Sequence, residues 1–372
     1  MKRELEQIEI PDEHGARERT WPVVAAAFGE RQPVEPRPRR LRPVIVLAVA
    51  LVAVAAAVSA PGRAVIDDIR EAVGVERAET GLFSLPAAGR LLVASDAGVW
   101  VVQPDGSKRL LGTYREATWS PFGRFVAAAG ANELAALEPD GSVRWTLSRQ
   151  GVTSPRWTGT ATDTRIAYVD RSGIRLVGGD GTGDSLLVPK ARGPLAWRPG
   201  AGFVLAYATP RGVRVLDLQK DYVVWKARRP EGRVTAIEWS SDGRRLLVLS
   251  PHHLNVYDDR GRQVDQEDPS EGWPDVAAAF RPGSHDVGVA RVHGSQSTAY
   301  VLNRRTLFNG FGVFQDLAWS PDGRWLLVTW PTADQWVFVE AEGKRRIRGV
   351  GNVAAQFRSR SAPRIEGWCC EP

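Results

Sequence analysis

Short runs of apolar residues alternate with turns rich in glycine, proline and aspartate from roughly residue 82 to residue 360. The clearest unit is Ala318–Val328, whose sequence AWSPDGRWLLV joins two apolar runs through a Pro-Asp-Gly turn. Related copies recur along the chain, each opening with an aromatic anchor: Trp119, Trp157, Trp197, Trp239, Phe280, Trp319 and Phe357. Successive anchors lie 38 to 42 residues apart, a narrow spacing that indicates a structural repeat.

One period of this repeat has the pattern of four β-strands. Within residues 316–350, runs at 316–319, 325–329, 336–340 and 345–349 are separated by a Pro-Asp-Gly turn, a loop and a Glu-Gly turn. Glycine suits these tight turns because it adopts positive φ angles without a steric penalty. Four strands in about forty residues is the size of one propeller blade. The sequence therefore predicts an all-β fold, a β-propeller of four-stranded blades.

The two ends of the repeat region predict how the ring closes. Gly89–Gly112 has the pattern of three strands with a weak first strand, and Asn352–Phe357 has one spare strand of the first type. Because a blade cannot bury both of its faces alone, the blades must stack into a closed ring. We expect one composite blade built from both ends, which gives seven blades. Six or eight blades are the alternatives, eight if Phe83 and Ser84 open the first blade.

A charge-free stretch of 17 residues, Val44–Ala60, precedes the repeats. It approaches the ~20 residues that cross a bilayer as a helix. Four arginines directly precede it: Arg37, Arg39, Arg40 and Arg42. The positive-inside rule therefore predicts a single transmembrane helix with a cytoplasmic N-terminus and an extracytoplasmic propeller. A signal peptide cleaved after Ala60 is the alternative, although Pro61 would directly follow the cleaved bond.

The chain is thus predicted to have four parts: a cytoplasmic arm (1–43), the membrane segment (44–60), an extracytoplasmic stalk (61–80) and the propeller (81–372). The arm has the apolar stripe of a short amphipathic helix between Asp12 and Arg31. A lone helix of this length cannot bury its stripe, so it either docks on a partner or lies on the membrane surface. The stalk has a helical apolar stripe as well, from Ala64 to Val75.

Composition narrows the class of protein. Of the 372 residues, 43% are hydrophobic and 25% are charged, which is too apolar for a disordered chain. The formal net charge of +6 is spread along the sequence rather than gathered in one stripe, so we expect no nucleic-acid partner. The two cysteines, Cys369 and Cys370, are neighbours, and we expect them to pack as a tail or stay reduced rather than to form a disulfide framework.

The phrase Trp319–Arg324, WSPDGR, resembles the WD40-like propeller repeat of bacterial extracytoplasmic proteins of the TolB type. The copy at Trp239 is also close to that repeat, whereas the copies at Trp157 and Phe280 have lost most of it. The resemblance covers roughly residues 82 to 360. It implies a scaffold whose funnel face or rim binds proteins, peptides or sugars, and it does not name a ligand.

Residues with catalytic or metal-binding chemistry are scarce. Asp242 and Asp322 lie in turns where an aspartate side chain caps backbone amides. His252 and His253 have no further ligand at a suitable spacing. We therefore expect no catalytic, cofactor-binding or metal-binding residues. Trp273 is a weak candidate for a binding surface, because it lies outside the repeated core positions.

Together these patterns predict a non-catalytic binding or scaffold module, anchored in the membrane, with a protein or peptide partner. One alternative is transmembrane signalling, in which the helix of the arm holds a cytoplasmic regulator such as a sigma factor. Another is an envelope enzyme with a quinone or glycan substrate. Leu137–Trp145 and Leu216–Trp225 faintly resemble the repeats of quinone-dependent dehydrogenases, but both lack the Thr-Gly step of those repeats.

Overall fold

The chain divides into two units, Met1–Ile66 and Asp67–Pro372. The computed structural model describes residues 75–76, 84–200, 202–228, 232–268, 273–343 and 345–370, all in the second unit. The predicted arm, the predicted membrane segment and nearly all of the predicted stalk therefore lie outside the described residues. Among the residues that are described, no helix combines the length and the apolar character needed to cross a bilayer.

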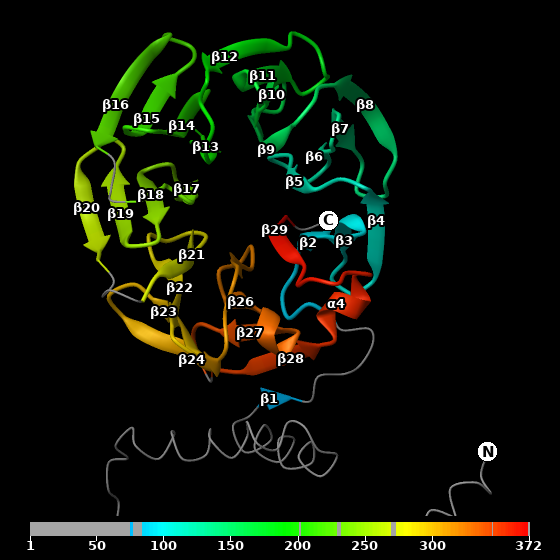
Figure 1. Ribbon diagram of the computed structural model, residues 1–372, viewed down its shortest axis with the longest axis vertical. Helices are drawn as coiled ribbons and strands as arrows, with labels where there is room; N and C mark the ends of the chain where they lie inside the picture. The colour runs from blue at the N-terminus through cyan, green and yellow to red at the C-terminus, as the bar shows by residue number, and fades with distance from the viewer. Residues whose placement is uncertain are drawn as a thin grey trace, which may run out of the picture. The chain divides into compact units, whose positions relative to one another are not determined.

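The second unit contains a ring of seven β-sheets around a central axis (Figure 1). Six sheets have four antiparallel strands, and the seventh has a fifth strand at its outer edge. That fifth strand, β1 (Val75–Glu76), pairs in parallel with Ile347 and Arg348 of β28, so the described end of the predicted stalk is a short strand. The predicted all-β propeller is confirmed, with seven blades rather than six or eight.

Each blade is built from strands that follow one another outward from the axis. In ring order they are blade 1, β29 (Arg364–Cys369), β2 (Arg90–Ser95), β3 (Gly98–Val102) and β4 (Lys108–Gly112); blade 2, β5 (Glu116–Trp119), β6 (Val126–Ala129), β7 (Glu133–Leu137) and β8 (Val143–Ser148); blade 3, β9 (Thr153–Gly159), β10 (Thr164–Val169), β11 (Gly173–Gly178) and β12 (Ser185–Pro189); blade 4, β13 (Leu195–Trp197), β14 (Val204–Thr209), β15 (Gly212–Asp217) and β16 (Tyr222–Arg228); blade 5, β17 (Ala236–Trp239), β18 (Arg245–Ser250), β19 (His253–Asp258) and β20 (Gln263–Glu267); blade 6, β21 (Asp275–Phe280), β22 (Val287–His293), β23 (Gln296–Val301) and β24 (Arg305–Phe311); and blade 7, β25 (Leu317–Trp319), β26 (Trp325–Trp330), β27 (Gln335–Glu340) and β28 (Ile347–Gly351). Two short helices, η2 (Pro331–Ala333) and α4 (Val353–Gln356), flank β27 and β28 in the sequence.

Both ends of the propeller region build blade 1, as the sequence predicts. β29 pairs antiparallel with β2, and Trp368 lies opposite Leu91 in the position that Trp319 takes in blade 7. Trp368 is therefore the aromatic anchor of blade 1. Directly at the end of this strand, Cys369 and Cys370 are joined in a disulfide, contrary to the expectation of reduced thiols. Cys370 there has left-handed backbone, with φ at 46°.

The closing strand predicted at Asn352–Phe357 is wrong, because most of these residues form α4. Asn352 takes the left-handed conformation (φ 54°) directly after β28, which ends the extended chain. The carboxylate of Asp334 then accepts a hydrogen bond from the backbone N–H of Ala354 at 2.8 Å, which satisfies a free donor of the first helical turn. Phe357 is fully buried and packs with the core between blades 7 and 1.

The turn after β25 shows which hydrogen bonds the repeated Ser-Pro-Asp-Gly sequence forms. Ser320 Oγ donates a 2.5 Å hydrogen bond to Asp322 Oδ1, which also accepts the backbone N–H of Arg324 at 3.0 Å. Gly323 has a φ of 67°, a conformation that glycine adopts without strain. Asp242 caps the corresponding turn of blade 5 in the same way. The predicted turn role of both aspartates is confirmed.

The hydrophobic core is divided into seven clusters, and each joins two neighbouring blades. Between blades 4 and 5, for example, Val213 and Val215 of β15 pack with Trp239 and Leu246. Each blade is apolar on both faces, so it is stable only between two neighbours. The tryptophans predicted to be core are all buried: Trp119, Trp157, Trp197, Trp239 and Trp319.

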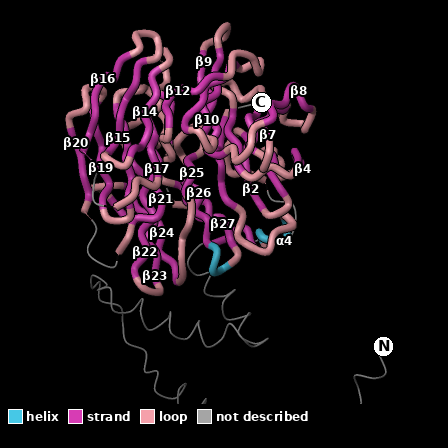
Figure 2. The backbone as a smooth tube through the Cα atoms, turned by 45° about the horizontal axis from the view of Figure 1, so that its top comes forward, coloured by secondary structure: helices cyan, strands magenta, loops and turns pink. Residues whose placement is uncertain are grey.

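The strands run from one end of the ring to the other, and the loops collect at these two ends (Figure 2). We call one end the start face, because the innermost strands β5, β9, β13, β17, β21, β25 and β29 begin there. The loops between the second and third strands of each blade lie at the same end. We call the opposite end the turn face, because it holds the Asp-Gly turns. The two faces share the same core and differ in their loops.

Candidate functional site

The innermost strands are sheet edges, so the backbone groups that face the axis have no partner within their own sheet. At four junctions, a carboxylate from one blade accepts a backbone N–H from the next blade: Glu366 from Ala117 (3.4 Å), Glu116 from Ser154 (2.5 Å), Glu238 from Phe280 (3.3 Å) and Asp316 from Ile365 (3.3 Å). At two more, an indole N–H donates to a carbonyl of the preceding blade: Trp197 to Arg156 (2.9 Å) and Trp319 to Ala279 (3.1 Å). Hydrogen bonds from side chains thus link neighbouring blades around the axis.

Burial changes the acidity of these carboxylates. It raises the pKa of Glu238 to about 8 and that of Glu366 to about 7, and it raises the pKa of Asp316 above its usual range. The charge of Arg156 opposes the rise at both glutamates. Raised carboxyl pKa values also mark general acids. Here each of these carboxylates holds the backbone of a neighbouring blade, so the geometry indicates a structural role.

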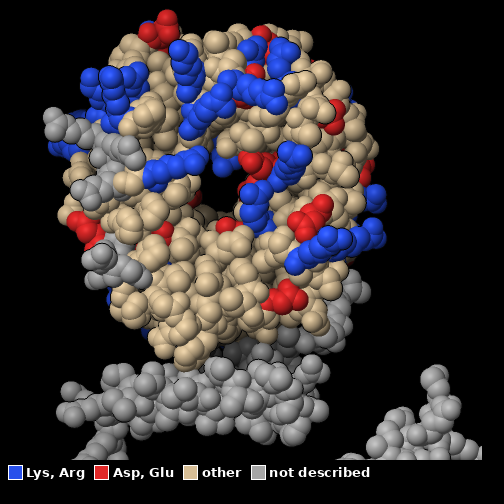
Figure 3. All heavy atoms as spheres, viewed as in Figure 1, with Lys and Arg blue, Asp and Glu red and all other residues tan. Residues whose placement is uncertain are grey.

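A cavity of about 640 Å³ opens on the start face beside the axis. The charged side chains of its wall come from blades 1 to 5: Arg156, Arg192, Arg233, Arg364, Glu116 and Asp170. Lys and Arg side chains gather around the upper rim of the central opening and over blades 3 and 4, whereas the lower left of the ring presents mainly uncharged residues (Figure 3). Positive charge is therefore concentrated on one part of this face.

Both carboxylates of this wall have partners outside the groove arginines, and Asp170 also lies 3.8 Å from Arg175. Glu116 accepts the backbone N–H of Ser154 in the neighbouring blade. Asp170 accepts the backbone N–H groups of Ser172 at 2.7 Å and of Gly173 at 3.2 Å. In the described part of the chain, Arg192 and Arg233 form no ion pair with a carboxylate, whereas Arg364 pairs with Glu366 at 3.3 Å. The lining of the cavity thus has four arginines and two carboxylates, which leaves an excess of positive charge.

Two further cavities continue along the start face. One of about 730 Å³ shares Arg364 with the first cavity, and one of about 440 Å³ shares Thr113 and Tyr114 with the second. We call the three cavities together the start-face groove. The charged residues that line the first cavity are four arginines and two carboxylates, and those that line the second are Arg115, Arg364 and Asp96. The third cavity has Glu133 as its one charged lining residue. The remaining wall is largely neutral and polar.

The predicted binding residue Trp273 lies on the start face, in the loop that leads into β21. Its side chain is 39% exposed and stacks on His293, with 3.5 Å between the ring centroids. Phe311 and Val313, at the same end of blade 6, are 40% and 42% exposed. We call Trp273, Phe311 and Val313 the apolar patch. Trp273 is not part of the groove wall, and its role in binding stays a prediction.

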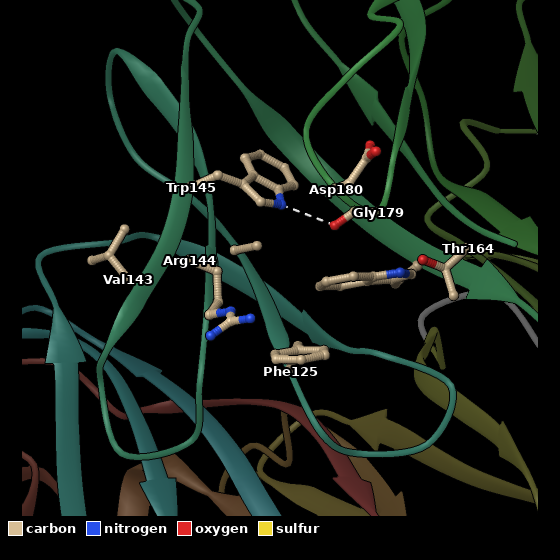
Figure 4. A pocket seen from close by; sticks show the side chains of 9 residues that line it. Phe125, Val143, Arg144, Trp145, Thr164, Gly179 and Asp180 are labelled. Carbon is tan, nitrogen blue, oxygen red and sulfur yellow. Dashed lines mark hydrogen bonds between the residues drawn. The ribbon is translucent and has the colours of Figure 1, made fainter. Parts of the chain in front are cut away.

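A cavity of about 490 Å³ between blades 2 and 3 has an aromatic wall (Figure 4). Phe125 and Trp157 stack there with centroids 6.1 Å apart, and Trp145 donates its indole N–H to the carbonyl of Gly179 at 2.9 Å. An equivalent bond joins blades 4 and 5, where Trp225 donates to the carbonyl of Asp259 at 3.1 Å. Because the bond recurs, we assign this aromatic wall to the packing of neighbouring blades.

Two of the histidines, His253 and His285, each pair with a single carboxylate. His253 Nδ1 lies 2.7 Å from Asp268 Oδ1, and His285 Nε2 lies 3.0 Å from Asp242 Oδ2. Within the described residues, no three potential metal ligands come together.

The arginines of the groove are the feature that the sequence prediction missed, because in linear order the charge looks evenly spread. The signal is periodic. In four blades an arginine precedes the anchor by four to six residues: Arg115 before Trp119, Arg192 before Trp197, Arg233 before Trp239 and Arg364 before Trp368. A closed ring brings equivalent positions of each repeat to one face, so these arginines gather at the start face.

No family model and no curated protein matches this chain in sequence. Among solved structures, the β-propeller domain of Myceliophteria thermophila Cps50 (Swd1) is similar, with a TM-score of 0.54 and 14% identity over 69% of this chain and 95% of that chain. Kuenenia stuttgartiensis hydrazine synthase has a TM-score of 0.49 and 12% identity over 60% of this chain and 76% of that chain. The first likeness supports the fold alone: this chain forms a seven-bladed, WD40-like β-propeller.

Proposed function

We propose that this protein is a membrane-anchored, extracytoplasmic binding module that recognises a protein partner through the start face of its propeller and catalyses no reaction itself. One observation carries the proposal: within the described residues, Arg192 and Arg233 of the start-face groove form no ion pair with a carboxylate, while Glu366 around the axis already pairs with Arg364 and Glu238 accepts a backbone N–H. Loops on a rigid scaffold are where binding residues concentrate. The groove combines such loops with a charge that a partner can complement.

The membrane anchor and the location rest on the sequence. The charge-free stretch Val44–Ala60 behind its arginines supports a cytoplasmic N-terminus, and the TolB-type phrase Trp319–Arg324 supports an extracytoplasmic propeller. The test uses full-length protein with a tag at each end, in right-side-out membrane vesicles. We expect added protease to remove the C-terminal tag and to spare the N-terminal tag. Protection of the C-terminal tag would refute the location, and release of intact protein by alkaline carbonate would refute the anchor.

The use of the start face is tested by photo-crosslinking from two matched positions. Arg211 lies in the β14–β15 loop on the start face, and Arg260 lies in the β19–β20 loop on the turn face; both are exposed. A photoreactive amino acid replaces each in turn in the full-length protein, which is then irradiated in its native membrane. We expect partner adducts from position 211 and none from position 260. Equal adducts, or adducts from 260 alone, contradict the proposal.

A further inference from the structure

Three arginine side chains of the start-face groove are held in place by hydrogen bonds to the backbone. Backbone carbonyls hold three of its arginines: Arg156 donates to the carbonyl of Pro155 at 2.8 Å, Arg192 to that of Arg171 at 2.6 Å and Arg364 to that of Arg115 at 2.8 Å. A carbonyl takes one donor of the guanidinium and leaves its charge and its other donors available, as at Arg192, whereas Arg364 also pairs with Glu366 at 3.3 Å. Side chains already held in place lose less entropy when a ligand binds.

The ligand chemistry follows from the guanidinium group. A planar guanidinium matches a carboxylate through two parallel, charge-assisted hydrogen bonds. Arg192 and Arg233 lack such a partner within the described structure, so an incoming carboxylate would be their first. Both side chains are exposed, which leaves them accessible from the start face.

The distribution of charge along the groove distinguishes two kinds of extended anion. A nucleic-acid strand carries one charge on every phosphate and needs positive charge along its whole path. In this groove the arginines decrease from four in the first cavity to two, beside Asp96, in the second, and the last cavity has Glu133 as its one charged lining residue. Neutral polar groups, among them Thr113 and Tyr114, line both the middle and the end of the groove beside these few charges. This pattern fits a ligand whose negative charges are gathered at one end.

We propose that the start-face groove binds an extended polypeptide segment whose acidic side chains enter the arginine cavity and whose neutral residues run past Tyr114. This inference rests on the proposed function, because it names the kind of partner segment that the start face accepts.

The test measures fluorescence anisotropy with purified full-length protein in detergent and a labelled peptide. The peptide carries four successive glutamates at one end and a Gly/Ser/Thr sequence at the other. A second peptide has four glutamines in place of the glutamates, and a single-stranded oligonucleotide of similar length represents the competing class of anion. We expect the glutamate peptide to bind at least tenfold more tightly than the glutamine peptide and than the oligonucleotide.

Two double variants locate the site. Arg192→Gln with Arg233→Gln removes the two groove charges that have no ion pair among the described residues, and it should weaken binding of the glutamate peptide at least tenfold. Arg244→Gln with Arg260→Gln removes two exposed charges from the turn face and should leave that affinity within twofold of the parent. Circular dichroism confirms that both variants are folded.

Equal affinity for the glutamate and glutamine peptides would overturn the inference, as would equal losses in the two double variants. Oligonucleotide binding as tight as that of the glutamate peptide would overturn it in favour of a nucleic-acid ligand. These outcomes differ from a failure of the proposed function. A protein that yields partner adducts from position 211 but does not prefer the glutamate peptide keeps its binding role and loses the acidic segment as its ligand.

Discussion

Two regions of the start face rest on the same scaffold and present opposite chemistry. Over blades 3 to 5, the loops that lead into β13 and β17 contribute Arg192 and Arg233 to the groove. Over blade 6, the same face presents the apolar patch. Beneath the two regions, Trp239 and Trp319 are buried alike, at 5% and 4% exposure. The comparison teaches that the repeat determines the core while the loops determine the surface.

The largest expected effect concerns this shared core. Trp239→Ala opens the junction of blades 4 and 5 below the basic region, and Trp319→Ala opens the junction of blades 6 and 7 beside the apolar patch. Each should lower the free energy of unfolding by about 3 to 5 kcal/mol, since a large buried ring is lost. Denaturant unfolding of both variants provides the measurement. A large loss in one variant and a negligible loss in the other would contradict an equivalent core.

The next effect is the pH dependence of the acids around the axis. The pKa of Glu238 rises to about 8 in the folded protein from 4.5, so the folded state holds this proton more tightly than the unfolded state. The stability that this proton contributes is complete below about pH 4.5 and is lost as the pH rises through 8. Glu238→Gln, which carries no titratable proton, should therefore flatten the decline and exceed the parent at pH 8 by about 1 to 3 kcal/mol.

Thermal unfolding between pH 5 and pH 9 follows this difference. Glu366→Gln at another junction serves as the comparison, and its gain should be smaller because the pKa of Glu366 rises only to about 7. A Glu238→Gln protein that is less stable than the parent at every pH would show that the carboxylate is charged when it holds Phe280.

A smaller effect is expected from salt, which should change binding at the start-face groove but not at the apolar patch. Raising sodium chloride from 50 to 300 mM should weaken binding of the glutamate peptide several-fold, because the exposed arginines of the groove are screened by ions. Binding of the neutral dye Nile red to the apolar patch should not weaken under the same change. Fluorescence titrations at the two salt concentrations measure both. A peptide affinity that does not change with salt would contradict a role of the arginine charges in binding.

The smallest effect is expected at Trp273, the residue that sequence pattern singled out. Because its ring is 39% exposed, Trp273→Ala should lower stability by less than about 1 kcal/mol. It should also reduce Nile red binding while leaving the affinity for the glutamate peptide unchanged. Chemical denaturation and the two titrations test this. A stability loss comparable with that of Trp319→Ala would mean that Trp273 belongs to the core.

The sequence predicted the blades because each repeats the same local pattern of anchor, turn and strand. It failed at the closing strand. Phe357 continues the spacing of about forty residues, whereas the true anchor, Trp368, follows Trp319 only after α4 and an added loop. Spacing alone cannot reveal such an insertion, since both residues are aromatic and both are buried.

The groove was harder to predict than the fold for a related reason. Its arginines lie in loops of unequal length, so Arg115 is four residues before its anchor and Arg233 is six before its own. These arginines come together on one face only when the ring of blades is closed. Trp273 stands outside the repeated anchor positions in the sequence and its side chain is 39% exposed, and its role in binding stays a prediction.

The central claim is that partners bind at the basic part of the start face. Hydrogen–deuterium exchange of the full-length protein, with and without the glutamate peptide, tests it most directly. We expect slower exchange at residues 149–156, 190–194 and 232–235, which contribute to the arginine cavity, and no change at 240–244 or 259–262 on the turn face. Protection confined to the turn face, or to the apolar patch around Trp273, would contradict it.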